Sequence, residues 1–209
     1  MTKDLLIVFV KNLKLGKVKT RLAKTIGDQA AFEVYAELVK LTERATQTLA
    51  IDKRIYFSDA IIKTQWKNEF KAIQQGKDLG ERMLNAFKKG FEEGYERIVL
   101  IGSDLPDISE THIKNAFAAL QEVNVTFGPA EDGGYYLVGL SELHPNVFID
   151  KPWSTSHLLD DTLLELKRNN IAYKLLEPLN DIDTFEDLKA SKFYKSNLKL
   201  QEKIKQLHD

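Results

Sequence analysis

The chain has 209 residues, of which 43% are hydrophobic and 29% are charged, a balance typical of a globular protein with one sizeable core. Its formal net charge of −1 gives no bulk attraction to nucleic acid or anionic lipid. The absence of cysteine excludes disulfides and thiolate metal sites, and no apolar run is long enough to span a bilayer.

The first half of the chain alternates between apolar runs and helical patterns. Residues 5–10 form a continuous apolar run, which is typical of a strand buried on both faces. This run leads into Lys11 without the small residues of a cleavage site, so we expect no signal peptide and a cytoplasmic location. The other elements expected here are helices at 28–49, with Asp28 as the N-cap, 64–70 and 78–93, and strands at 54–58, 72–75 and 97–101.

In the second half of the chain, the alternation of strands and helices is interrupted once. We expect a helix from its cap Ser109 through residue 120, strands at 124–127 and 135–140, a helix at 156–168, a strand at 171–176 and a mostly helical stretch at 184–207. The alternation predicts βαβ units and a mainly parallel sheet, whereas the two consecutive strands predict a mixed or antiparallel insertion. Because repeats and linkers are absent from the sequence, a single α/β domain is the simplest interpretation.

A basic loop follows the first expected strand. Residues 11–21 carry four lysines and one arginine around Gly16. The loop lies where open α/β sheets bind ligands, and its cations suit phosphate groups. A Walker loop is excluded, because that motif needs glycine in place of Lys11 and serine or threonine in place of Val18. We favour phosphate binding over the alternative of a solvated basic loop.

A lone carboxylate follows the strand expected at 97–101. Asp104 stands in the segment Gly102-Ser103-Asp104-Leu105-Pro106, where the proline stops the strand. An acid at the carboxyl end of a parallel strand lies at the ligand-binding edge, and Mg²⁺ prefers such oxygen ligands. The alternative is that Asp104 caps a turn or the next helix, although Ser109 is the better cap.

Two more acidic segments come later. In the first, Glu131-Asp132 precedes Gly133-Gly134, which permits either close approach of a ligand or a plain hairpin turn, and both interpretations stay open. In the second, Asp181 and Asp183 fall on one side of an extended segment, yet Asp183 or Thr184 also suits a helix N-cap.

The remaining motifs are weaker. The glycine-flanked helix start at 75–82 either faces a nucleobase or caps the helix. The four histidines have no mutual metal-ligand spacing, and no Ser-His-Asp set or glycosidase-type acid pair is recognisable.

In chain order these segments resemble the GT-A type nucleotide-diphospho-sugar transferase fold, a three-layer α/β/α (Rossmann-like) architecture. The chain looks most like the "transferase 1, radical-SAM/selenodomain-associated" group, a glycosyltransferase-like family (DUF2064). That group is similar to 2-phospho-lactate guanylyltransferases and molybdenum-cofactor nucleotidyltransferases. The resemblance runs from residue 5 to about 190, through Phe9-Val10-Lys11, Gly16, Val18-Lys19-Thr20-Arg21-Leu22, Asp78-Leu79-Gly80-Glu81-Arg82-Met83, Gly102-Ser103-Asp104-Leu105-Pro106, residues 128–137, Trp153-Ser154-Thr155 and Asp181-Ile182-Asp183-Thr184. Leu13 and Phe185 stand where relatives usually have proline, and neither change removes a charge.

The resemblance implies one transferase domain over residues 1–209, with a helical tail at 190–209, that uses Mg²⁺ or Mn²⁺. The implied catalytic residues are Lys19, Arg21 and Asp104. The implied nucleotide-binding residues are Lys11, Gly16, Lys19, Arg21, Gln75, Asp78, Gly80 and Ser103. The implied acceptor-binding residues are Glu131, Asp132, Gly133, Gly134, Trp153, Ser154 and Thr155. The implied metal ligands are Asp104 and Asp183, with Asp181 in reserve.

The first activity we expect is Mg²⁺-dependent transfer of a nucleoside monophosphate from a triphosphate to a small phosphorylated acceptor, with release of pyrophosphate. The alternative is a glycosyltransferase that uses a nucleotide sugar. Such enzymes of this fold often carry Asp-x-Asp at the midway strand, whereas here Asp104 alone precedes Leu105-Pro106. A further alternative is a non-catalytic nucleotide-binding module. The expected partners are a nucleotide and a small acceptor, not nucleic acid or membrane, and the oligomeric state stays open.

Overall fold

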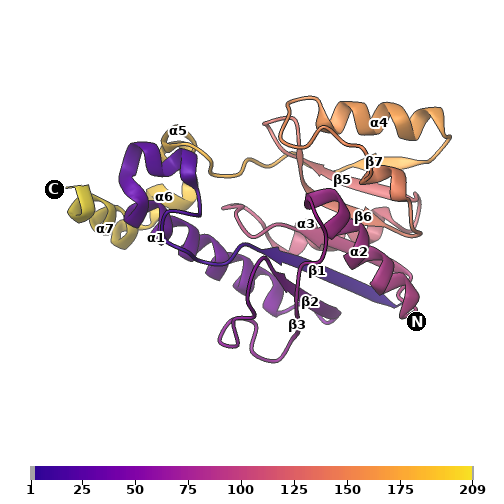
Figure 1. The fold of residues 1–209 in the computed structure, drawn as a ribbon, viewed down its shortest axis with the longest axis horizontal. Helices are drawn as coiled ribbons and strands as arrows, with labels where there is room; N and C mark the ends of the chain where they lie inside the picture. Colours follow the sequence, from indigo (N-terminus) through magenta and orange to yellow (C-terminus); the bar gives the residue numbers. More distant parts are fainter. Residues whose placement is uncertain (1–2, 209) are drawn as a thin grey trace.

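The structure is a computed structural model that describes residues 3–208. Within these residues, seven strands form one sheet in the order β3-β2-β1-β4-β6-β5-β7 (Figure 1). The strands are β1 (Asp4–Val10), β2 (Asp52–Phe57), β3 (Phe70–Ile73), β4 (Arg97–Ile101), β5 (Val125–Pro129), β6 (Tyr135–Leu140) and β7 (Tyr173–Leu175). Strand β6 is antiparallel to both β4 and β5, and the other neighbouring pairs are parallel. The mostly parallel sheet with an antiparallel insertion is therefore confirmed.

Helices cover both faces of this sheet. They are α1 (Thr20–Gln47), α2 (Leu79–Glu92), α3 (Glu110–Ala119), α4 (Leu158–Arg168), α5 (Phe185–Ala190), α6 (Lys192–Ser196) and α7 (Leu198–His208), with a short 3-10 turn η1 (Pro145–Val147). Apolar side chains of α1 and α3 pack on one face, and those of α2 and α4 pack on the other. The result is the expected three-layer α/β/α arrangement.

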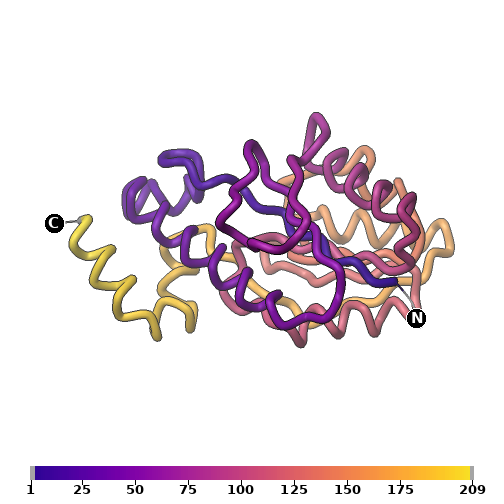
Figure 2. The backbone as a smooth tube through the Cα atoms, turned by 90° about the horizontal axis from the view of Figure 1, so that it is seen from below, coloured from indigo at the N-terminus to yellow at the C-terminus, as the bar shows by residue number. Residues whose placement is uncertain are grey.

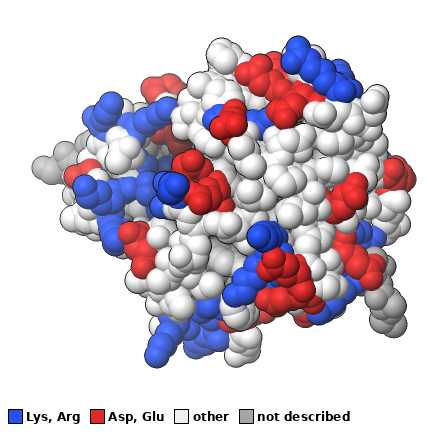
Figure 3. Space-filling model, turned by 45° about the vertical axis from the view of Figure 1, so that its right-hand side comes forward, with Lys and Arg blue, Asp and Glu red and all other residues white. Residues whose placement is uncertain are grey.

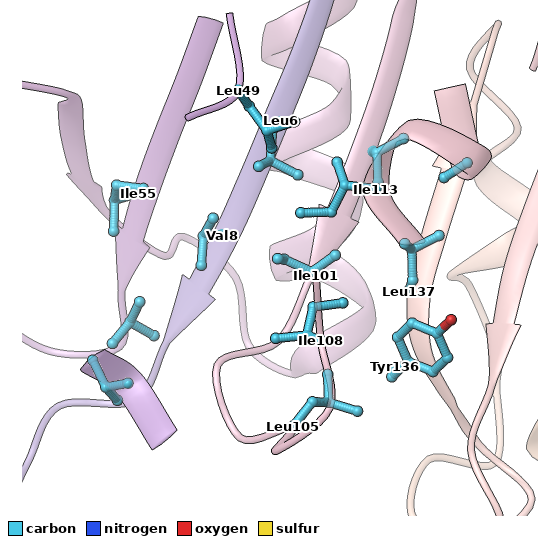
Figure 4. Packing of buried hydrophobic residues seen from close by; sticks show 14 of the residues in the cluster. Leu6, Val8, Leu49, Ile55, Ile101, Leu105, Ile108, Ile113, Tyr136 and Leu137 are labelled. Atoms are coloured by element: carbon cyan, nitrogen blue, oxygen red, sulfur yellow. The ribbon is translucent and has the colours of Figure 1, made fainter. Parts of the chain in front are cut away.

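The apolar run of β1 reflects this double covering. Leu6 and Val8 point to the face shared with α1 and α3, whereas Leu5 and Ile7 point to the face shared with α2. In Figure 4, Leu6 and Val8 lie in the same apolar layer as Ile101 at the end of β4. Successive side chains of a strand face opposite ways, so a strand buried on both faces has no polar alternation.

Two helical predictions differ from the structure. Helix α1 begins at Thr20, not at residue 28, and it is broken at Gly27, which has φ 80° and ψ 157°. The second part of α1, from residue 28, is the helix that the sequence pattern predicted. The short helix expected at 64–70 is wrong, because this stretch forms turns in which Trp66 has a left-handed φ of 41°. The indole of Trp66 is buried and donates to Thr46 Oγ1 at 2.9 Å, a long-range contact that local periodicity does not encode.

Helices α5 and α7 pack against the first part of α1. Leu200 and Ile204 of α7 and Leu188 of α5 are buried in one cluster with Leu22 and Ile26. Figure 2 shows α7 (yellow) beside the first part of α1 (indigo), at the opposite end of the molecule from α4. Among residues 3–208 no helix has the length and apolar character needed to cross a membrane. Acidic and basic side chains are mixed on the face drawn in Figure 3.

Candidate active site

The candidate site forms where β1 and β4, which are adjacent and parallel, reach their carboxyl ends. The hydroxyl of Tyr35 joins the two loops that follow them. It accepts a hydrogen bond from the Lys11 backbone N–H at 3.0 Å and lies 2.9 Å from Ser103 Oγ. Burial, and then the charge of Asp104, raise the pKa of Tyr35 to about 12. Tyr35 therefore stays neutral and fixes both loops to α1.

Lys19 is the centre of the site. Its side chain is only 6% exposed, and its Nζ lies 3.0 Å from Asp104 Oδ2 and 3.1 Å from Asp183 Oδ1. Burial opposes the charge of Lys19, but the two carboxylates outweigh it and raise the pKa above its usual value. The backbone of Lys19 is left-handed, with φ 46° and ψ 49°, a conformation that is strained for a lysine.

Asp183 is held by a capping box at the start of α5. Thr184 is the N-cap, and its hydroxyl accepts from the Asp187 N–H at 3.2 Å. Asp187 Oδ2 in turn accepts from the N–H groups of Thr184 at 2.7 Å and Asp183 at 3.1 Å. Because Thr184 caps the helix, the side chain of Asp183 is free to contact Lys19 and, at 3.2 Å, Nη1 of the exposed Arg21. The capping interpretation thus applies to Thr184, and the functional interpretation of Asp183 stays a prediction.

A basic hollow surrounds Lys19. This cavity of about 380 Å³ is lined by Lys11, Val18, Lys19, Thr20, Arg21, Tyr35, Asp104, Ser154 and Asp183. Its cations come from the loop after β1 and from the first turn of α1. A hollow with several cations beside two carboxylates suits a phosphate chain that is bound together with a divalent cation.

An aromatic cavity of about 270 Å³ adjoins the basic hollow, and the two share Asp104 and Ser154. Its walls include aromatic rings and carboxylates, namely Phe9, Tyr135, Tyr136, Trp153, Asp104, Asp132 and Asp181. Leu79, Met83, Leu100 and Leu105 contribute further apolar surface. None of the described residues that line this cavity is lysine, arginine or histidine.

Three carboxylates, those of Asp104, Asp183 and Asp181, act on Lys19 where the two cavities meet. Burial raises the pKa of Asp181 to about 6, and the neighbouring Asp104 adds to the shift. Within residues 3–208 no cluster of three or more potential metal-binding side chains is present. A pair of carboxylates is nevertheless enough for Mg²⁺, which takes much of its coordination from water and substrate phosphates. Asp104 and Asp183 both contact the Lys19 ammonium, so their carboxylates lie close enough together to fit Mg²⁺.

Residues 37–155, more than half of the chain, match the family model described as "Uncharacterized protein conserved in bacteria (DUF2064)". The chain belongs to the DUF2064 family. The resemblance inferred from the sequence motifs is thereby confirmed. No curated protein matches the chain.

Solved structures extend the comparison for this DUF2064 protein. A Desulfovibrio desulfuricans G20 protein with the provisional description nucleotide-diphospho-sugar transferase is 32% identical, with 99% of each chain covered and a TM-score of 0.86. The inositol-1-phosphate CTP transferase from T. maritima is 17% identical, with 98% of this chain and 97% of that chain covered and a TM-score of 0.58. The 4-diphosphocytidyl-2C-methyl-D-erythritol synthase from Anaerococcus prevotii DSM 20548 is 12% identical, with 96% of each chain covered and a TM-score of 0.62. The last two show a shared fold alone.

The fold brings most of the predicted site residues of this DUF2064 chain to the two cavities. Those that line a cavity are Lys11, Lys19, Arg21, Asp104, Asp132, Gly134, Trp153, Ser154 and Asp183. Those that line neither are Gly16, Gln75, Asp78, Gly80, Ser103, Glu131, Gly133 and Thr155. The ligand roles of both groups stay predictions.

Several residues of the second group have visible structural tasks. Asp78 caps α2 by accepting from the Glu81 N–H at 2.9 Å. Gly80 packs under Trp153, since a Cβ at Gly80 would lie 2.7 Å from Trp153 Cζ2. Gly133 has a φ of 88°, and its Cβ would lie 2.0 Å from the carbonyl oxygen of Ser156.

Sequence reasoning missed the position of Tyr35 beside the candidate site. The helix expected at 28–49 includes Tyr35, whose ring is buried in the core, but its pattern is not informative about the hydroxyl. A tyrosine on the buried face of a helix is the signal that could have been used, because a buried hydroxyl usually finds a polar partner.

Proposed function

We propose that this protein is a transferase that moves a nucleoside monophosphate from a nucleoside triphosphate to a small phosphorylated acceptor, with release of pyrophosphate. The observation that carries the proposal is the position of the Lys19 ammonium, 3.0 Å from Asp104 and 3.1 Å from Asp183 inside a basic hollow. Basic side chains that suit a triphosphate therefore lie beside two carboxylates that suit a divalent cation, at the carboxyl edge of the sheet.

The chemistry needs positioning more than covalent catalysis. An oxygen of the acceptor phosphate attacks the α-phosphorus, and the bond from that phosphorus to the bridging oxygen breaks as pyrophosphate leaves. Lys11, Lys19 and Arg21 would bind the phosphates and stabilise the negative charge that develops on the leaving group. Tyr35 supports this set by holding the Lys11 backbone in place.

Asp104 and Asp183 would hold Mg²⁺ or Mn²⁺. When bound, the ion neutralises phosphate charge and orients the phosphate oxygens. Asp181 would remain in reserve as a ligand, since its carboxylate faces the same region from the aromatic cavity. Lys19, which contacts both carboxylates, would also lie within the hollow that holds the phosphates when Asp104 and Asp183 hold the ion.

A glycosyltransferase that uses a nucleotide sugar is the second candidate. The provisional description of the Desulfovibrio protein supports it. We prefer the nucleotidyl reaction because the basic loop of residues 11–21 suits a triphosphate better than a diphosphate sugar, and because Asp104 has no second acid two residues further on.

One assay separates the candidates. Pyrophosphate release is measured from the four common nucleoside triphosphates with a panel of sugar phosphates, and free nucleotide release is measured from matching nucleotide sugars. Pyrophosphate release that needs both acceptor and Mg²⁺ supports the proposal. Release of nucleoside diphosphate from nucleotide sugars alone supports the second candidate, and binding of nucleotides without turnover of either kind contradicts both.

A further inference from the structure

We infer that the aromatic cavity binds the body of the acceptor, and that this body is a neutral ring bearing hydroxyl groups, of the sugar or cyclic polyol class. An acceptor whose body carries a carboxylate or a second phosphate is excluded. The inference rests on the proposed function in one respect, since it assigns the basic hollow to the nucleotide and the adjoining cavity to the other substrate.

The walls of the cavity suit the faces of a ring. Trp153 and Tyr135 meet edge to face, with ring centroids 6.4 Å apart, and Tyr135 also packs against Phe127 at 5.0 Å. Gly80 lets the indole of Trp153 sit directly on the start of α2. The aromatic wall is therefore fixed by packing, and it can lie against the apolar C–H face of a sugar ring. A volume of about 270 Å³ suits one ring and not a whole nucleotide.

The charges of the cavity define what the ring can carry. Besides Asp104, which contacts Lys19, Asp132 and Asp181 contribute carboxylates, and the described lining residues include no cation. Carboxylates accept hydrogen bonds from hydroxyl groups, whereas they repel a carboxylate or phosphate on the ligand. Asp132 uses Oδ1 to accept from the Gly134 N–H at 2.9 Å, so its other oxygen can accept from a ligand.

The join between the cavities fits a ring that bears a single phosphate. Ser154 and Asp104 line both cavities, so a phosphate attached to a ring in the aromatic cavity reaches toward Lys19 and Arg21. The one negative group of the acceptor then lies on the basic side, and its neutral part lies on the acidic side. We therefore expect the site to bind hexose phosphates. Phosphorylated hydroxy acids should bind less well, because they have a carboxylate next to the phosphate.

The test measures binding without turnover, through the fluorescence of Trp153. The purified protein is titrated with glucose 1-phosphate, glucuronic acid 1-phosphate, 3-phosphoglycerate and glucosamine 1-phosphate. We expect glucose 1-phosphate to saturate, and the two carboxylate compounds to bind at least about tenfold more weakly. Trp153→Phe is the control, because Trp66, the other tryptophan, is buried beside α1 and should not respond.

A charge variant tests the cause of the discrimination. Asp132→Asn keeps an oxygen for the Gly134 N–H and removes the negative charge, so it should reduce the preference over glucuronic acid 1-phosphate to about threefold or less. Equal binding of neutral and carboxylate compounds by the unchanged protein, or no binding of any, overturns the inference. Binding of glucosamine 1-phosphate at least about tenfold tighter than glucose 1-phosphate overturns the hydroxyl assignment in favour of an amine. Lack of pyrophosphate release with every triphosphate would defeat the proposed function alone, since these titrations contain no nucleotide.

Discussion

The two edges of the sheet use charge in opposite ways. Near the amino ends of the strands, Arg97 of β4 forms a two-pronged pair with Asp4 of β1, at 2.8 and 3.1 Å, and Arg54 pairs with Glu93. Each cation there has its own acid. At the carboxyl edge, Lys19 is shared by two acids while further carboxylates face the aromatic cavity. Matched pairs hold strands together, whereas unmatched acids leave charge for a ligand or metal ion to neutralise.

The largest effect is expected from removing the charge of Asp104 at the carboxyl edge of the sheet. Asp104→Asn removes a charge but keeps the shape, so turnover in the pyrophosphate assay should fall by about 100-fold or more. The midpoint of thermal unfolding should change little, because the side chain is partly exposed and already shares Lys19. Asp107→Asn, an exposed acid three residues further on, is the matched control. Normal turnover in Asp104→Asn would remove Asp104 from the proposed metal site.

Lys19→Ala tests the other charge at the same edge. Loss of the ammonium should weaken triphosphate binding by about tenfold or more, since hydrogen bonds between charged groups are strong. Acceptor binding should weaken less, because only the acceptor's phosphate reaches toward Lys19, whereas its ring lies in the aromatic cavity, which Lys19 does not line. Calorimetry with each ligand separately measures both, with the exposed Lys17→Ala as control. Equal weakening of the two ligands would point to a structural role for Lys19 alone.

At the amino edge, where each cation pairs with its own acid, a substitution is expected to change stability and not turnover. Arg97→Met leaves Asp4 without its partner in a mostly buried position, which should lower the free energy of unfolding by about 2 kcal/mol. Denaturant unfolding measures this change. Lys88→Ala, which removes an exposed and long ion pair at 3.9 Å, should have no measurable effect. A loss of turnover in still-folded Arg97→Met would contradict the division between the two edges.

The smallest effect is expected at Tyr35, which supports the functional edge without carrying charge. Tyr35→Phe removes the acceptor of the Lys11 N–H and the partner of Ser103, at a cost of about 1 kcal/mol in unfolding free energy. The KM for triphosphate should rise severalfold while kcat changes less. Adding Ser103→Ala should cost little more, because both changes break the same contact. Fully additive losses would show that the two hydroxyls act independently.

The sequence was most informative where structure is local. The apolar run of β1, the helix expected at 78–93 and the strand end before Asp104 depend on short stretches, and each lies close to where the pattern predicted. The family and fold followed from the order of these segments. The single-domain boundary, the cytoplasmic location and the role of Mg²⁺ stay predictions.

The sequence was least informative where distant segments meet. The turn at Trp66 is set by burial against α1, and no local pattern distinguishes it from a short helix. The position of Gly80 under Trp153 depends on the packing of two segments that are more than seventy residues apart in the sequence. The shared use of Lys19 by Asp104 and Asp183 is likewise a product of the complete fold.

The capping box that holds Asp183 has a consequence for the order of synthesis. Lys19 and Asp183 are 164 positions apart, and Asp183 is anchored only when Ile182 and Leu188 dock against the first part of α1. A chain still leaving the ribosome therefore has the basic loop and Asp104 long before it has the second acid. The proposed site is therefore complete only after Asp183 and the helix that follows it have been added, and a chain that stops before Asp183 lacks the second acid.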